Sequence, residues 1–144
     1  LARGGVRPAN LQEFDSVLVA AAEMYREELR ADPFVVGAGV PFRRRVARSV
    51  ARARTFVALE RGEVFFKADV AAISERIAQI QGVWVQPRLR GTGIGAGGTA
   101  AVCAALQARG LTPSLVVNGA NAPARAAYRR VGMVDVVDYA TILM

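Results

Sequence analysis

Histidine is absent from the 144 residues of this sequence, and cysteine and lysine occur once each. Without histidine, neither a Ser–His or Cys–His catalytic pair nor a histidine metal ligand is possible. The single cysteine, Cys103, excludes an internal disulfide and a cysteine-based zinc site. Because Cys103 lies in an Ala-rich apolar segment, a buried structural thiol is favoured over a nucleophile. We therefore expect a cytoplasmic protein without a bound metal.

Long apolar runs are also missing. None approaches the roughly 20 residues that a membrane helix requires, and the first residues lack the pattern of a secretion signal. An apolar fraction of 53% with 22% charged residues is typical of a compact chain, and the length predicts a single domain over residues 1–144. The first residue is Leu1 rather than Met, which is consistent with a fragment of a longer protein.

Arginine supplies nearly all of the positive charge. The formal net charge is +7, and Lys67 is the only lysine. This charge favours a phosphate-bearing ligand or an acidic partner. Several arginines cluster in one expected helix, where a solvated face and a functional basic patch both remain open: Arg43, Arg44, Arg45, Arg48, Arg52 and Arg54.

Apolar periodicity predicts a mixed α/β order within one domain. Asn10 and Glu13 have the spacing of a capping box at the start of the first helix, and Asp32-Pro33 ends it. The short connections between the three strands in the middle of the chain favour an antiparallel meander. We predict strands at residues 4–8, 55–60, 63–70, 77–85, 114–118 and 133–144, and helices at residues 11–30, 41–54, 93–109 and 123–131.

Closely spaced glycines follow the third meander strand and lead directly into a helix. Backbone N–H groups in such a turn can converge on one point, and the helix N-terminus adds unpaired donors. The turn therefore predicts a pyrophosphate site, with a tight packing turn as the alternative. A dinucleotide motif at residues 93–98 is disfavoured, because the next strand ends in Asn118 rather than an acidic residue. Thr99, in place of lysine, excludes a P-loop.

Two motifs in this region resemble those of the GCN5-related N-acetyltransferases (GNAT). Residues 90–95, Arg-Gly-Thr-Gly-Ile-Gly, match the family's Arg/Gln-x-x-Gly-x-Gly/Ala signature, after a Val-x-Val-x-Pro strand at residues 83–87. A second motif, Asn-x-x-Ala-x-x-x-Tyr-x-x-x-Gly, spans residues 121–132. More narrowly, the chain resembles the C-terminal half of actinobacterial proteins with an uncharacterised N-terminal domain. The resemblance implies a GNAT fold: a mixed central sheet with an antiparallel meander and a splayed parallel pair, flanked by about four helices.

The resemblance also implies the activity, namely transfer of the acetyl group of acetyl-CoA to a primary amine. Amides of the glycine turn would hold the pyrophosphate, and the strand before it would pair with the pantetheine arm. Tyr128 would be the general acid for the departing thiolate, and Asn121 would bind pantetheine or cap the last helix. The implied coenzyme A residues are Val83, Trp84, Val85, Arg90, Gly91, Thr92, Gly93, Ile94, Gly95, Ala96, Asn121 and Tyr128.

The general base departs from the family pattern. Gln79 and Gln81 occupy positions where many relatives have carboxylates, and an amide cannot accept a proton. The remaining candidates are Asp69, Glu63, the carboxylates of the first helix, or a water relay. We favour Asp69, because the meander could direct it to the cleft. An ion pair with Lys67 is the alternative.

Two other functions stay open, as does the acceptor. Loss of the usual carboxylates permits a catalytically silent acyl-CoA-binding or regulatory module. A nucleic-acid partner is not favoured, because recognition motifs are lacking and aromatic residues are few. The acceptor is a small-molecule or peptide amine, and the arginine helix favours an acidic one. Residues 32–41, the second helix and the last strand would form its pocket. A homodimer is not excluded.

Overall fold

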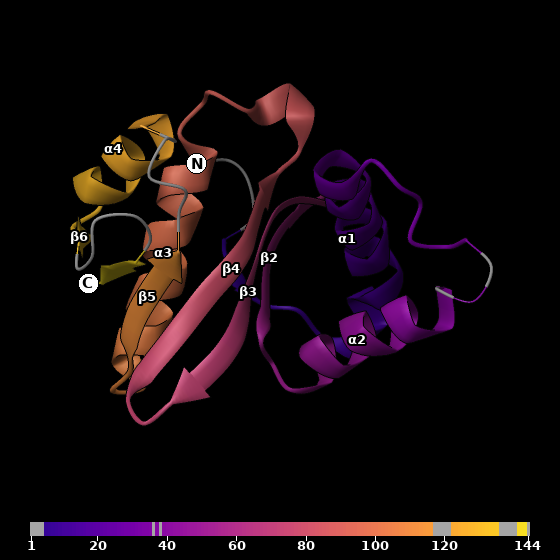
Figure 1. The fold of residues 1–144 in the computed structure, drawn as a ribbon, viewed down its shortest axis with the longest axis horizontal. Helices are drawn as coiled ribbons and strands as arrows, with labels where there is room; N and C mark the ends of the chain where they lie inside the picture. Colours follow the sequence, from indigo (N-terminus) through magenta and orange to yellow (C-terminus); the bar gives the residue numbers. More distant parts are fainter. Residues whose placement is uncertain (1–4, 36, 38, 117–121, 136–140, 144) are drawn as a thin grey trace.

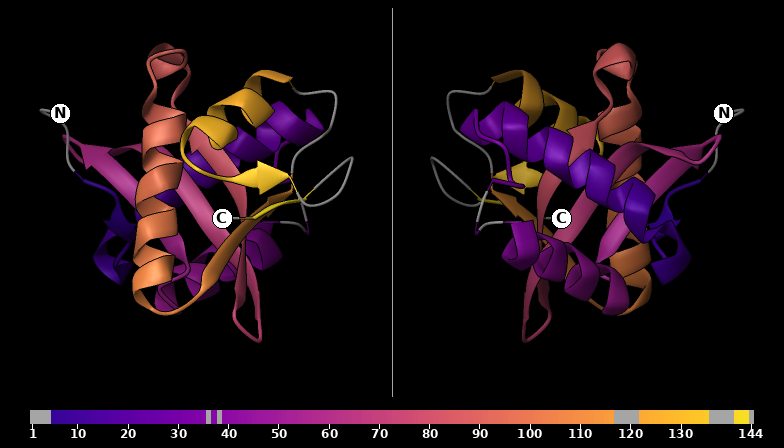
Figure 2. Two further views of the ribbon diagram at one scale, coloured as in Figure 1. Left: turned by 90° about the vertical axis from the view of Figure 1, so that its left-hand side faces the viewer. Right: turned by 90° about the vertical axis from the view of Figure 1, so that its right-hand side faces the viewer.

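A mixed β-sheet separates two layers of helices (Figure 1). The structure is a computed structural model that describes residues 5–35, 37, 39–116, 122–135 and 141–143. Helices α1 (Phe14–Leu29) and α2 (Gly39–Ala51) cover one face of the sheet, and α3 (Ile94–Ala108) and α4 (Ala122–Arg130) cover the other. The two side views separate these layers clearly (Figure 2). The predicted α/β class with four flanking helices is confirmed.

The sheet contains the predicted meander and one parallel pair. The strands are β1 (Arg7–Pro8), β2 (Thr55–Glu60), β3 (Glu63–Ser74), β4 (Ile77–Val85), β5 (Thr112–Val116), β6 (Val134–Asp135) and β7 (Thr141–Leu143). They are ordered β1-β2-β3-β4-β5-β7-β6. All neighbouring strands are antiparallel except β4 and β5. A crossover through α3 makes that pair parallel, as expected for a strand–helix–strand unit.

Strands β4 and β5 separate at one end, as the resemblance predicted. Their pairing runs from Ile77↔Thr112 to Ile80↔Leu115. Strand β4 then continues to Val85 without a β5 partner among the described residues, and Figure 1 shows the two ribbons diverging. Within the part of the chain that the structure describes, backbone polar groups on this edge of β4 have no strand partner and can pair with another extended chain.

Several predicted boundaries were wrong. Strand β1 begins at Arg7 rather than residue 4, α2 ends at Ala51 rather than residue 54, and β5 begins at Thr112 rather than residue 114. Strand β3 extends to Ser74 rather than residue 70, because its pairing with β4 continues through Ser74↔Ile77. Helix α2 begins at Gly39, two residues before Pro41, since a proline in the first turn costs no helical hydrogen bond. The last segment forms two short antiparallel strands, β6 and β7, instead of one.

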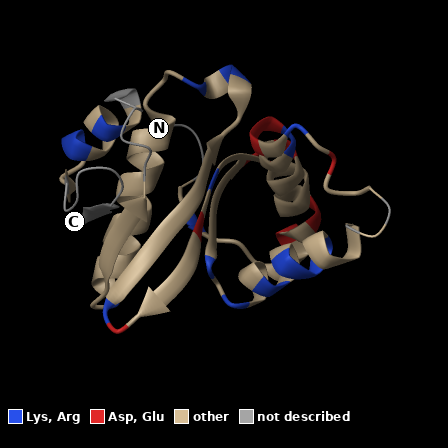
Figure 3. Ribbon diagram, in the orientation of Figure 1, with Lys and Arg blue, Asp and Glu red and all other residues tan. Residues whose placement is uncertain are grey.

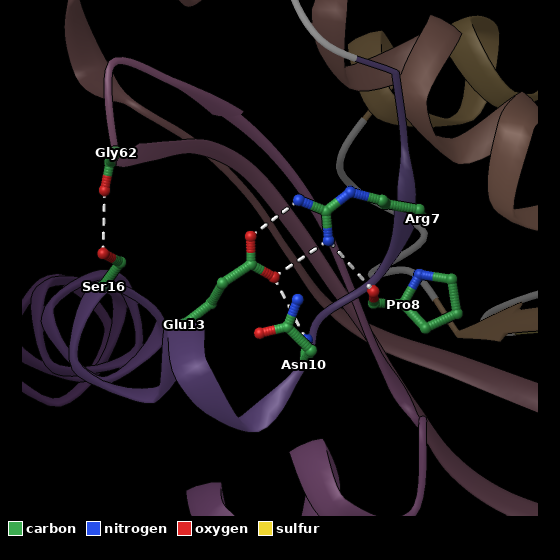
Figure 4. A network of polar contacts seen from close by, with 6 residues as sticks. All are labelled: Arg7, Pro8, Asn10, Glu13, Ser16 and Gly62. Atoms are coloured by element: carbon green, nitrogen blue, oxygen red, sulfur yellow. Dashed lines mark hydrogen bonds and ion pairs between the residues drawn. The ribbon is translucent and has the colours of Figure 1, made fainter.

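Polar contacts fix the start of α1 against the sheet (Figure 4). The Glu13 carboxylate accepts a hydrogen bond from the backbone N–H of Asn10 at 3.1 Å, the reach-back expected of a capping box. It also pairs with the Arg7 guanidinium at 2.6 Å, which lowers the pKa of Glu13. Ser16 donates to the carbonyl of Gly62 in the β2–β3 turn at 2.7 Å. These contacts orient α1 along the sheet and direct its last turn towards the end of β4.

Each face of the sheet has its own apolar core. The α3 residues Val102, Cys103 and Leu106 are fully buried against the sheet. Burial raises the pKa of the Cys103 thiol to about 11, in agreement with the structural role predicted for it. No described helix is both long and apolar enough to cross a membrane.

Gly98 sets the distance between α3 and the sheet. A Cβ atom at this position would lie 2.5–2.6 Å from three ring carbons of Phe66, which is fully buried. We expect Gly98→Ala to lower the free energy of unfolding by about 1–3 kcal/mol. The matched control is Gly97→Ala, whose Cβ meets nothing within 4 Å and which should stabilise the helix by up to about 1 kcal/mol. Urea unfolding measures both, and equal midpoints would contradict the role of Gly98.

Candidate functional site

The glycine turn joins the end of β4 to the start of α3. After a short 3-10 turn (Pro87–Leu89), Gly91 and Gly93 have φ angles of +79° and +87°, a region that strongly favours glycine. The N–H of Gly97 donates to the carbonyl of Gly93 at 2.9 Å and closes the first turn of α3. Amides before Gly97 therefore form the N-terminal end of a 15-residue helix, where an anion is stabilised.

Arg90 connects this turn to α1. Its Nε donates to the carbonyl of Val85 at 2.9 Å, and its guanidinium donates to the Glu27 carboxylate at 2.8 Å. The indole N–H of Trp84 donates to the same Glu27 oxygen at 2.9 Å. The hydrogen bond from Arg90 lowers the pKa of Glu27, with a smaller contribution from Trp84. An ionised Glu27 thus holds the last turn of α1, the end of β4 and the glycine turn together.

A cavity of about 400 Å³ opens between these elements, and we call it the turn cavity. It brings together residues from the C-terminal end of α1, the separated end of β4, the start of α3 and α4. Its lining consists of Met24, Glu27, Glu28, Val83, Trp84, Val85, Arg90, Gly95 and Tyr128. Six of the residues that the sequence assigned to coenzyme A therefore line one cavity.

The other assigned residues differ in position. Gly91, Gly93 and Ala96 belong to the turn and the first helical residues but are not among the cavity lining. Thr92 donates its hydroxyl to the Leu89 carbonyl, and the Ile94 side chain packs into the core. Asn121 lies outside the described residues.

Tyr128 reaches the turn cavity from α4. Its ring packs against the core beneath α3, and the side chain is half-buried. Burial raises the pKa of the phenol, so it stays protonated throughout the neutral range. It faces the same cavity as Val85 and Gly95. This placement gives the cavity a proton donor beside the end of β4 that has no β5 partner among the described residues.

A second cavity of about 890 Å³, the helix cavity, lies between α1, α2 and the sheet. Its apolar lining includes Tyr25, Leu29 and Phe42. Its charged lining consists of Glu28, Arg45, Arg48, Arg52, Arg54, Lys67 and Asp69. The turn cavity and the helix cavity share Met24 and Glu28, which are four residues apart on α1. The two cavities therefore meet at the last turns of this helix.

Asp69 lies in the helix cavity, and both of its oxygens have partners. The Thr55 hydroxyl donates to Oδ1 at 2.8 Å, and the buried ammonium of Lys67 pairs with Oδ2. The ion pair that the sequence left as an alternative is therefore present. Gln81 also lines this cavity, whereas Gln79 and Glu63 line neither cavity. No group of three or more potential metal-ligating side chains occurs within the described residues.

Sequence reasoning did not single out Met24, Glu27 and Glu28. It treated the carboxylates of the first helix only as a group. Their three- and four-residue spacing places them on one side of the helix, and this spacing is the one sequence feature that links them. That spacing does not reveal which neighbour this side contacts.

The sequence matches the model of the Acetyltransferase (GNAT) family over residues 21–133. The match covers most of the chain and includes both cavities and the glycine turn. The chain therefore belongs to the GNAT family of acetyltransferases. No curated protein matches the sequence.

Solved structures share the fold at low sequence identity. The PaiA N-acetyltransferase of Thermoplasma acidophilum, in complex with coenzyme A, is 12% identical with a TM-score of 0.68, covering 96% of this chain and 95% of that one. A phosphinothricin acetyltransferase of Sinorhizobium meliloti, in complex with AcCoA, is 20% identical with a TM-score of 0.72, covering 99% and 88%. A GNAT acetyltransferase from Colwellia psychrerythraea is 14% identical with a TM-score of 0.73, covering 99% and 49%.

Proposed function

We propose that this protein transfers the acetyl group of acetyl-CoA to a primary amine. The observation that carries the proposal is the turn cavity, where an unpaired strand edge, a helix N-terminus and a protonated tyrosine meet. The coenzyme A and AcCoA complexes of the two similar structures support the choice of ligand.

The residues present fit coenzyme A. Amides from Arg90 to Ala96 would bind the pyrophosphate at the start of α3. The free edge of β4 at residues 83–85 would pair with the pantetheine amides as a neighbouring strand does. Asn121 would contribute a hydrogen bond to the same arm. When bound, acetyl-CoA would supply an activated thioester carbonyl.

The reaction needs a proton acceptor and a proton donor. The amine nitrogen forms a bond to the carbonyl carbon, the carbon–sulfur bond breaks, and the amine loses a proton. Tyr128 donates a proton to the departing thiolate and regains one from water. A backbone N–H of β4 near Val83 would stabilise the oxyanion. Asp69 remains the base candidate from the sequence, although Lys67 and Thr55 occupy its two oxygens.

The occupied Asp69 and the glutamines at positions 79 and 81 favour one second candidate, an acyl-CoA-binding module without turnover. Release of free coenzyme A from acetyl-CoA in the presence of a panel of primary amines separates the two. Amine-dependent release supports the enzyme. Tight binding without any release supports the silent module.

Gly95 offers a direct test of the cofactor site. Its Cβ would lie 3.5 Å from Cγ2 of Val85, an ordinary contact, so a larger side chain would extend into the turn cavity. We expect Gly95→Val to weaken acetyl-CoA binding tenfold or more, about 1.4 kcal/mol, as measured by calorimetry. Gly97→Val, at an exposed position outside the cavity, is the matched control. Equal affinities in the two folded variants would remove the turn cavity from the proposal.

A further inference from the structure

The helix cavity is divided by charge. Arg45 and Arg48 line it from α2, and Arg52 lines it from the turn directly after that helix, at three- and four-residue spacing. None of these three forms an ion pair with any acidic residue in the described part of the chain. Figure 3 shows Lys and Arg along α2, and both acidic and basic residues at the C-terminal end of α1. The uncompensated charge on the α2 side creates a region that attracts anions.

Glu28 provides the opposite charge where the cavities meet. It lines both of them, whereas the arginines of α2 line only the helix cavity. Among the residues that the structure describes, no hydrogen-bond donor or cation contacts its carboxylate. The other two carboxylates have partners. Glu27 accepts hydrogen bonds from Arg90 and Trp84. Asp69 accepts a hydrogen bond from Thr55 and forms an ion pair with Lys67. Of these three carboxylates, Glu28 is thus the one that can bind an ammonium next to the turn cavity.

Apolar side chains line the same cavity as the two charged regions. The rings of Tyr25 and Phe42 meet edge to face with centroids 5.5 Å apart, and Leu29 also lines the cavity. The Arg45 guanidinium lies 5.3 Å from the centroid of Phe42, a cation–π contact that keeps this charge at the cavity wall. A volume of about 890 Å³ is in the range of small-molecule sites.

We propose that the acceptor is a small amine with an anionic group, carboxylate or phosphate, at the other end of an apolar spacer. Glu28 binds the ammonium and accepts one of its protons, which gives the nitrogen the lone pair that attacks the thioester carbon. The arginines of α2 bind the anionic group. As the carbon–sulfur bond breaks, the nitrogen loses its second proton to water, and Glu28 also returns its proton to water. Tyr128 supplies a proton to the thiolate and regains one from water, so the net products are the amide, free coenzyme A and one released proton. This assignment rests on the proposed acetyl transfer.

The test uses amines that differ only in the anion, namely γ-aminobutyrate and n-butylamine with acetyl-CoA. We expect kcat/KM to be at least tenfold higher for γ-aminobutyrate and to fall with added salt. Arg48→Ala/Arg52→Ala should raise KM for γ-aminobutyrate about tenfold and leave n-butylamine unaffected. Arg44→Ala is the control, because Arg44 is an exposed arginine of α2 outside the cavity. Glu28→Gln should lower kcat for both amines.

Two results would overturn the inference: equal kcat/KM for the two amines, or equal effects of the arginine variant on both. Either leaves acetyl transfer intact. Binding is measured separately by NMR titration of the protein with each amine. If neither amine is acetylated but γ-aminobutyrate alone binds, and the arginine variant abolishes that binding, the proposed transferase activity fails and the anion site stands. Absence of binding and of turnover for γ-aminobutyrate rejects the site.

Discussion

Tyr128→Phe is expected to lower kcat by roughly 10- to 1,000-fold with acetyl-CoA affinity nearly unchanged. Phenylalanine keeps the ring that packs beneath α3 and removes only the hydroxyl that faces the turn cavity. Because burial raises the phenol pKa, the wild-type residue remains a proton donor at neutral and mildly alkaline pH. Initial rates and acetyl-CoA calorimetry on the same variant separate catalysis from binding.

The matched control is Tyr25→Phe, which removes a hydroxyl from the helix cavity instead. It should keep the wild-type kcat within a factor of about two and change at most KM for the acceptor, because Tyr25 lines the proposed acceptor site but lies outside the turn cavity. The Tyr128 variant must be examined under conditions in which chemistry limits turnover. Full kcat under those conditions would mean that water supplies the proton, and the role assigned to Tyr128 would be wrong.

Asp69→Asn is expected to destabilise the fold by about 3 kcal/mol, the lower end of the range for a broken buried ion pair. The substitution leaves the ammonium of Lys67 buried beside a neutral amide, and Lys67 is only 3% exposed. The Asp69 side chain is 22% exposed, so water offsets part of the loss. Urea unfolding measures the change. An unchanged midpoint would show that the pair contributes nothing to stability.

The double variant Lys67→Met/Asp69→Asn should recover most of that stability, because no unpaired charge remains in the sheet. It also tests the base suggested by the sequence. A folded double variant with wild-type kcat excludes Asp69 as the proton acceptor. A folded double variant without activity would assign that role to Asp69 and remove it from Glu28.

The fold was largely predictable because its signals are local. Short connections between apolar segments indicated the antiparallel meander, and the glycine spacing indicated the turn before α3. The end of β3 was missed because Ala71 and Ala72 carry little strand preference, and their position depends on pairing with β4. The approach of Gly98 to Phe66 was equally hidden, since it depends on the packing of a helix on a distant strand.

The site was predictable only in part. Residues at the glycine turn follow each other in sequence, so their motif identified them. Glu28 lies outside such a motif. Whether it lines the turn cavity depends on how α1 packs across the sheet, which the sequence does not show. The partners of Asp69 illustrate the same limit. Lys67 is two positions away on the same strand, whereas Thr55 reaches Asp69 through the register of β2 against β3.

The shared wall of the two cavities has an evolutionary consequence. Met24 and Glu28 line both cavities, so a substitution at either one would alter the proposed cofactor site together with the proposed acceptor site. The arginines of α2 border only the helix cavity. Acceptor preference can therefore diverge among descendants of this protein through α2, while acetyl-CoA recognition is inherited unchanged.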